Sequence, residues 1–169
     1  MNEEPAKDSV RALLVAQSLW IMRNDAAPTA IDAATRALIE GLDSAPLREL
    51  ASAAPDINVF ELGDLLEAAL GAAGIDIQEL TDDDALHLVA RQHAESVLRG
   101  DMRAREFAGW AHASIGHEGP AWAQDLVELD DQFDGFEGGW GEEPDWAQTL
   151  NRYLIVSQPV IDKWDRRAL

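Results

Sequence analysis

Two histidines and a neighbouring acid form the first pattern in the sequence that could do chemistry. His112, His117 and Glu118 could supply three ligands to a metal ion. However, a step of five residues places two histidines poorly on one face of a helix, and the pattern lacks the double-histidine helix motif of zinc hydrolases. We therefore predict no metal site here and expect ordinary histidines.

An acidic string at Asp130, Asp131 and Asp134 is the second pattern. A DDxxD string can hold magnesium in enzymes that use diphosphates, but those enzymes need basic residues for the phosphates, and none lies nearby in the sequence. The same residues resemble the start of a calcium loop, yet Gly141 occupies the position that requires a bidentate glutamate. A solvated helix end is the simpler interpretation, so we predict neither a metal ion nor another cofactor.

Motifs of the common enzyme classes are missing from the sequence. It contains no phosphate-binding loop, nucleophile elbow or dinucleotide fingerprint. Because the sequence has no cysteine, a catalytic thiol, a disulfide and a thiolate metal site are excluded. Pairs of carboxylates are so numerous that they do not discriminate general acid–base chemistry. We predict a protein that is not an enzyme, with a metal-dependent hydrolase using His112, His117 and the aspartates as the weakest alternative.

The charge of the chain limits its partners. The sequence has 32 acids and 13 bases, giving a formal net charge of −19. Such a charge repels nucleic acids and anionic membranes and attracts basic proteins. The acids are concentrated in two tracts without lysine or arginine, one between Arg48 and Arg91 and one between Arg105 and Arg152. Carboxylates without internal counter-ions weaken the fold by repulsion, so we expect a basic partner to relieve it.

The second tract also carries two aromatic residues in a glycine-rich stretch, where burial is difficult to arrange. Tryptophan is a common anchor in protein interfaces. We therefore predict a partner-binding surface, although both aromatic side chains could instead fold back onto the core. Its residues are Glu128, Asp130, Asp131, Asp134, Phe136, Glu137, Trp140, Glu142 and Glu143.

Helical periodicity dominates the sequence, and strand patterns are nearly absent. We predict an all-α fold: a single-domain helical bundle of about six to eight helices over residues 1–169, with a subdivision near 74–81 left open. In the first half, helices are expected over 8–24, from a capping box at Thr29 to Gly41, from Ser44 to about Ala53, over 58–73, and from Thr81 to Arg99. Val10, Leu13, Leu14, Leu19 and Trp20 should be buried, as should Val59, Leu62, Leu65, Leu66, Ala69 and Leu70.

The second half of the chain is expected to be helical as well. One helix should run from about Met102 to Gly116, and the next from Pro120 to about Asp131. Residues 135–144 hold several glycines and a proline, so we expect a loop. A final helical region around 146–154 should be interrupted at Pro159 and resume at 161–169.

Part of this second half is similar to a known family. The stretch ESVLRGDMRAREFAGWAHASIG, followed by LVELDDQFD, has a helix that ends in glycine, a short link and an aromatic helix that starts at Glu106 and Phe107 and contains Trp110. A helix with Leu126, Leu129, Asp130, Asp131 and Phe133 then follows. Over residues 95–133 this order resembles bacterial immunity proteins of the colicin D type. The resemblance implies a small, helical, acidic protein that fills the basic substrate cleft of a nuclease toxin with carboxylates.

These observations lead to one functional prediction. We expect an acidic, non-enzymatic binding protein that covers a basic protein surface, in the manner of a toxin-neutralising immunity protein. It should bind neither nucleic acid nor membrane. The lack of cysteine and of a basic stretch leading into an apolar run near Met1 leads us to expect a cytoplasmic protein. The alternative is a helical structural or regulatory domain that self-associates, for example as a homodimer.

Overall fold

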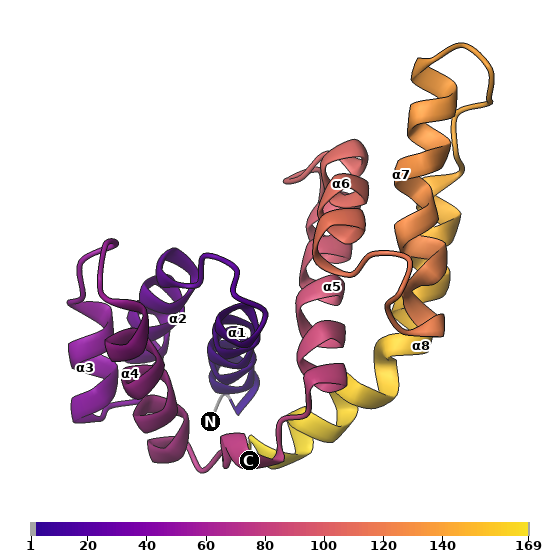
Figure 1. Ribbon diagram of the computed structural model, residues 1–169. Coiled ribbons are helices and arrows are strands. Elements are labelled where there is room, and N and C mark those ends of the chain that lie inside the picture. The colour runs from indigo at the N-terminus through magenta and orange to yellow at the C-terminus, as the bar shows by residue number, and fades with distance from the viewer. Residues whose placement is uncertain (1–2, 169) are drawn as a thin grey trace. The chain divides into compact units, whose positions relative to one another are not determined.

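The computed structural model describes residues 3–168, with side chains from Lys7 onward, and within these residues it contains only helices (Figure 1). The prediction of an all-α fold is therefore confirmed. Eight α-helices and two short 3₁₀ helices follow one another in this part of the chain: α1 Glu3–Ile21, α2 Ala27–Ile39, α3 Ala45–Ala51, α4 Val59–Ala72, η1 Ile77–Glu79, α5 Asp82–Arg99, α6 Ala104–Ser114, η2 Ala121–Ala123, α7 Gln124–Glu137 and α8 Trp146–Arg167. None of these helices is both long and apolar enough to cross a lipid bilayer.

The chain forms two compact units. The first unit comprises Met1–Val89 and Pro159–Leu169, and the second unit comprises Ala90–Gln158. Helices α5 and α8 each contribute residues to both units.

In the first unit, α2 packs against α1 and α3, and α4 packs against α1 and α3. Helix α2 can approach its neighbours closely because its buried face is built from alanines, including Ala30, Ala33, Ala34 and Ala37. The C-terminal segment adds Trp164, whose side chain is 1% exposed. Its indole Nε1 donates a hydrogen bond to Asp84 Oδ2 at 2.9 Å, and Lys163 forms a salt bridge with the same carboxylate.

Three of the predicted helix starts are confirmed by their caps. Ser44 Oγ accepts a hydrogen bond from the Leu47 amide, Asn58 caps α4, and Thr81 Oγ1 accepts one from the Asp84 amide. The predicted cap at Thr29 is wrong, because α2 begins earlier, at Ala27, with no side-chain cap. The apolar surface of α2 and its contacts with α1 stabilise this first turn without one.

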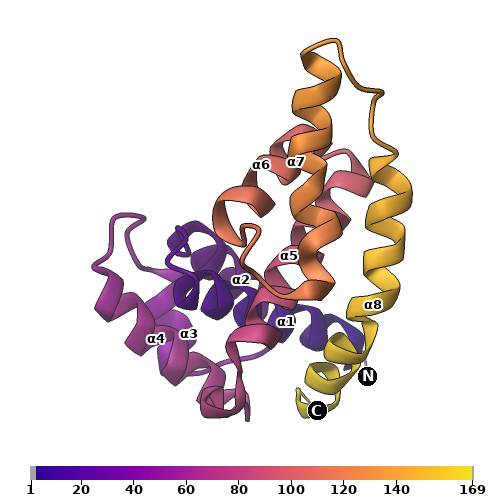
Figure 2. The ribbon, with the colours of Figure 1, turned by 45° about the vertical axis from the view of Figure 1, so that its right-hand side comes forward.

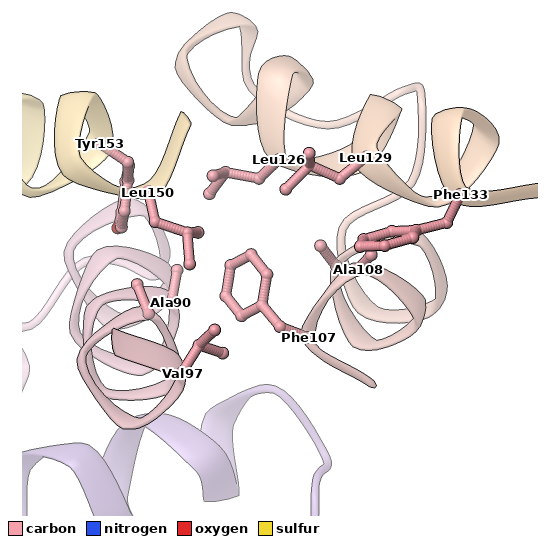
Figure 3. Packing of buried hydrophobic residues seen from close by; sticks show 11 residues of the cluster. Ala90, Val97, Phe107, Ala108, Leu126, Leu129, Phe133, Leu150 and Tyr153 are labelled. Atoms are coloured by element: carbon pink, nitrogen blue, oxygen red, sulfur yellow. The ribbon is translucent and has the colours of Figure 1, made fainter. Parts of the chain in front are cut away.

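The second unit is organised around the side chain of Phe107 on α6, which is fully buried (Figure 3). Leu126, Leu129 and Phe133 of α7 lie on one side of it. Helices α5 and α8 complete the cluster with Ala90, Ala94, Val97, Leu150 and Tyr153. This packing fixes α7 beside α6, and it therefore decides which acids of α7 lie close to α6.

Two of the predicted element boundaries are wrong in the second unit. Helix α7 continues to Glu137, so that Gly135 and Phe136 are helical and the loop covers only 138–145. The loop passes close to the end of the helix: a Cβ added to Gly141 would lie 3.2 Å from the carbonyl carbon of Gly135. Glycine at these positions therefore serves close packing rather than helix termination.

Helix α8 also runs without interruption through Pro159. Proline cannot donate a hydrogen bond to the carbonyl group four residues earlier, at Ile155. The side chain of Ile155 is 77% exposed, so water can reach this part of the helix surface and hydrate the free carbonyl. The predicted break was wrong because burial of Tyr153, Ile161 and Trp164 on either side stabilises the helix.

The predicted buried residues of the first unit are confirmed with three exceptions. Trp20 and Leu65 are only half-buried, and Val59 is 54% exposed. Trp20 lies against α4, where its indole Nε1 donates to the Val59 carbonyl at 2.7 Å. Trp20 thus covers the backbone of the first turn of α4, while the apolar side chains of that turn, Val59 and Phe60, are exposed.

Candidate binding surface on helix α7

Helix α7 carries three acids on the face that meets α6. Asp130, Asp134 and Glu137 recur at steps of four and three, which brings them onto one side of a helix. Arg105 of α6 pairs with all three: its Nη1 binds Asp130, its Nη2 lies 2.6 Å from Asp134 Oδ1, and its Nε lies 3.0 Å from Glu137 Oε1. The hydrogen bond to Asp130 and the charges of the three carboxylates raise the pKa of Arg105 above its ordinary value.

This arrangement corrects the expectation that the acidic tracts lack internal counter-ions. Three of the nine predicted surface residues share Arg105, which lies at the very edge of their tract. The first tract is similar, because Lys163 pairs with Asp84 and Arg167 pairs with Glu79. Counting charges along the sequence missed these pairs because the cations come from other helices.

Other acids of the predicted surface remain without such a cation. Glu128, Glu142 and Glu143 are exposed, and within residues 7–168 no ion pair involves them. Asp131 is 55% exposed and contacts histidine rather than arginine. Negative charge therefore remains along α7 and in the loop after it.

The two aromatic residues of the predicted surface are both exposed. The loop after α7 connects that helix to α8 (Figure 2). Trp140 in this loop is 80% exposed, and Phe136 in the last turn of α7 is 43% exposed. The indole of Trp140 lies over Gly138, where an added Cβ would come within 1.9 Å of its Nε1. Glycine at 138 thus leaves room for the indole against the backbone, and this exposed ring precedes the exposed acids Glu142 and Glu143 in the same loop.

The structure brings His112 and His117 together, although they do not share a helix. Helix α6 ends at Ser114, and Gly116 adopts a left-handed conformation with φ of 70°, so the chain turns back. The two imidazole rings meet edge to face at 5.1 Å. His117 Nε2 lies 3.2 Å from Asp131 Oδ2, and His112 Nδ1 lies 3.0 Å from Asp130 Oδ2.

In the sequence, the third possible ligand beside these two histidines was Glu118, and a step of five residues placed the histidines poorly on one helical face. The acid that joins them is instead Asp131 of α7, and Glu118 is not part of the cluster. Gly116 was the available signal, because a glycine stop between two histidines predicts that the chain reverses there. The role of Arg105 could not be read from spacing, since it depends on the packing of α6 against α7.

In comparisons with known proteins, no family model, no curated protein and no solved structure matches this chain.

Proposed function

We propose that this is a non-enzymatic binding protein that uses the end of α7 and the loop after it to cover a basic surface on another protein. The observation that carries the proposal is the exposed indole of Trp140 in the same loop as the acids Glu142 and Glu143, which have no ion pair within the described residues. A large exposed aromatic side chain in an acidic loop can anchor in an apolar pocket that is surrounded by positive charge.

Charge and apolar contact would have separate roles at this surface. The acids would speed the encounter with a basic partner and select against acidic ones, while burial of Trp140 and Phe136 would slow dissociation. Arg105 offsets only one of the three charges that it contacts, so the face formed by Asp130, Asp134 and Glu137 also stays net negative. Its ion pairs hold those carboxylates in fixed positions before a partner arrives.

The finer proposal is that the partner is a nuclease toxin and that the protein acts as its immunity protein. Two observations support it: the order of features over residues 95–133 resembles colicin D-type immunity proteins, and the exposed acids on α7 suit a cleft that normally binds nucleic acid. An inhibitor of this kind would compete with the phosphates of the substrate for the same lysines and arginines.

The test is a selection with a display library of protein fragments from the source genome, using the full chain as bait. We expect enriched fragments to be basic. Trp140→Ala should weaken their binding by about 2 kcal/mol, roughly thirtyfold in Kd. Glu142→Lys with Glu143→Lys should mainly slow association. For the nuclease proposal, the enriched fragments should cleave RNA or DNA, and addition of the protein should stop the cleavage.

Matched control variants lie in the first unit. Phe60 is 74% exposed, and Glu61 and Glu67 are exposed on the same helix, so Phe60→Ala and Glu61→Lys with Glu67→Lys make the same chemical changes elsewhere. These variants should bind the fragments as the unchanged protein does. Enriched fragments that are not basic, or that bind the Trp140 variant equally well, would show that the assigned surface is wrong.

A self-associating domain is the second candidate, because apolar side chains are also exposed in the first unit. Val59 and Phe60 line a hollow of about 620 Å³ together with Trp20 and Ile21. If this surface mediates a homodimer, sedimentation should show a dimer that persists at high salt and dissociates in Phe60→Ala. A monomer at all concentrations removes this candidate without affecting the first.

A further inference from the structure

The strongest unassigned site is the cluster formed by the two histidines at the end of α6 and Asp131 of α7. One ring nitrogen of His112, one of His117 and one carboxylate oxygen of Asp131 all lie within 4.8 Å of one another. Around a tetrahedral zinc ion the ligand atoms are roughly 3.4 Å apart, given metal–ligand distances of about 2.0–2.1 Å. Small side-chain rotations would therefore be enough to bring the three groups onto one ion.

We propose that His112, His117 and Asp131 bind a divalent transition-metal ion, of which Zn²⁺ is the best fit. Two imidazoles and one carboxylate are a ligand set that suits Zn²⁺, Co²⁺ or Ni²⁺, whereas Mg²⁺ and Ca²⁺ prefer oxygen ligands throughout. The side chains of His117 and Asp131 are 50% and 55% exposed, so an ion can reach the site from solvent. Three protein ligands leave a fourth position for water.

The contacts of His112 leave one of its two ring nitrogens for a metal ion. Its Nδ1 is shielded from solvent and makes no aligned hydrogen bond. The nearest charged atoms are carboxylate oxygens, Asp130 Oδ2 at 3.0 Å and Asp131 Oδ1 at 4.0 Å. A neutral imidazole with its proton on Nδ1 turns that proton toward the two carboxylates and leaves the lone pair of Nε2 available to a metal ion.

The surroundings of the cluster would also hold its ligands in place. Asp130 is fixed by Arg105, and its other oxygen lies beside His112, so the imidazole ring is oriented from the side. A carboxylate next to a metal-binding histidine raises the basicity of that ligand and restricts its rotation. Asp131 belongs to both the cluster and the predicted partner-binding surface, but the metal proposal does not depend on partner binding, since Trp140, Glu142 and Glu143 take no part in it.

The first experiment is a calorimetric titration of the full chain with Zn²⁺ at neutral pH, in a buffer that does not bind zinc. We expect one ion per chain with micromolar affinity or tighter. His117→Ala and Asp131→Asn should each lower the affinity at least about tenfold. Because both positions are half-exposed, these variants should still fold, and circular dichroism checks this.

Glu118→Gln provides the matched control, since it removes an exposed charge next to His117 without touching the cluster. Its affinity for Zn²⁺ should equal that of the unchanged protein. Co²⁺ gives a second readout, because a four-coordinate site produces intense visible absorption that should be absent in His117→Ala. The proposal is overturned if Zn²⁺ binds no more tightly than Mg²⁺, or if His117→Ala binds Zn²⁺ unchanged, because the acidic surface alone would then account for binding.

Discussion

Arg105 uses all three of its guanidinium nitrogens on carboxylates of α7. A planar fork with donors in fixed directions can reach three acids that are spaced along a helix, while a lysine ammonium is a single point. The side chain is about a third exposed, so solvent screens these contacts and each contributes modestly. What distinguishes this residue is that one side chain of α6 contacts three acids along the same face of α7.

We therefore predict that Arg105→Lys and Arg105→Gln each lower the free energy of unfolding by about 1 kcal/mol, because neither can replace the fork. Urea denaturation measures this change. Arg103→Gln is the control: Arg103 is 86% exposed and meets only Glu106, at 3.7 Å, so its loss should leave stability unchanged. Equal stability of the lysine variant and the natural protein would mean that charge alone, rather than geometry, matters at this position.

The contact between α4 and Trp20 depends on a glycine. A Cβ added to Gly63 would lie 2.7 Å from Trp20 Cζ2 and 2.8 Å from Cε2. The indole cannot withdraw easily, because its Nε1 is bound to the Val59 carbonyl. Gly71 lies on the same helix, yet a Cβ there would meet nothing within 4 Å.

The two glycines should therefore respond in opposite directions. Gly63→Ala should destabilise the protein by about 1–3 kcal/mol because the added methyl overpacks the contact with Trp20. Gly71→Ala should stabilise it by up to about 1 kcal/mol, since alanine favours the helix. Thermal unfolding of both variants tests the pair. Stabilisation by both substitutions would show that Trp20 moves freely.

Elements were predictable from the sequence where local signals decide them. Ser44 and Thr81 mark helix starts because a side-chain oxygen satisfies an amide within the same turn. The extension of α7 through Gly135 and the passage of α8 through Pro159 were not predictable, since packing against distant segments overrides a local breaker. The acidic surface shows the same limit: its residues could be named from composition, but the counter-ion Arg105 and the meeting of His117 with Asp131 exist only in the folded chain.

Each of the two units contains a histidine that folding withdraws from water. His87 is buried in the first unit, and His93 packs edge-on against Trp110 in the second, at 4.6 Å between ring centroids. Burial lowers the pKa of both histidines below the ordinary value of 6.5, with nearby carboxylates opposing part of the effect. Protons are thus bound more readily by the unfolded chain.

These lowered pKa values make the folded protein less stable in acid. Well above pH 6.5, both histidines are neutral in the folded and in the unfolded protein, so their contribution to the free energy of unfolding is fully present. As the pH falls through 6.5, the unfolded state takes up protons first, and this stability is lost. We predict a lower free energy of unfolding at pH 5.5 than at pH 7.5, measured by urea denaturation, and a smaller difference in the double variant His87→Gln, His93→Gln. An unchanged difference in that variant would assign the pH dependence to other groups.

The first unit takes its last piece, Pro159–Leu169, from beyond the second unit in the chain. Asp84 receives its two partners, Lys163 and Trp164, from that piece. During translation, the helices α1 to α4 therefore emerge well before the tryptophan that completes their unit, while every residue of the second unit is already available. The unit whose synthesis begins first is therefore completed last. In a nascent chain on a ribosome paused before the codon for Trp164, Asp84 lacks the hydrogen bond from the Trp164 indole.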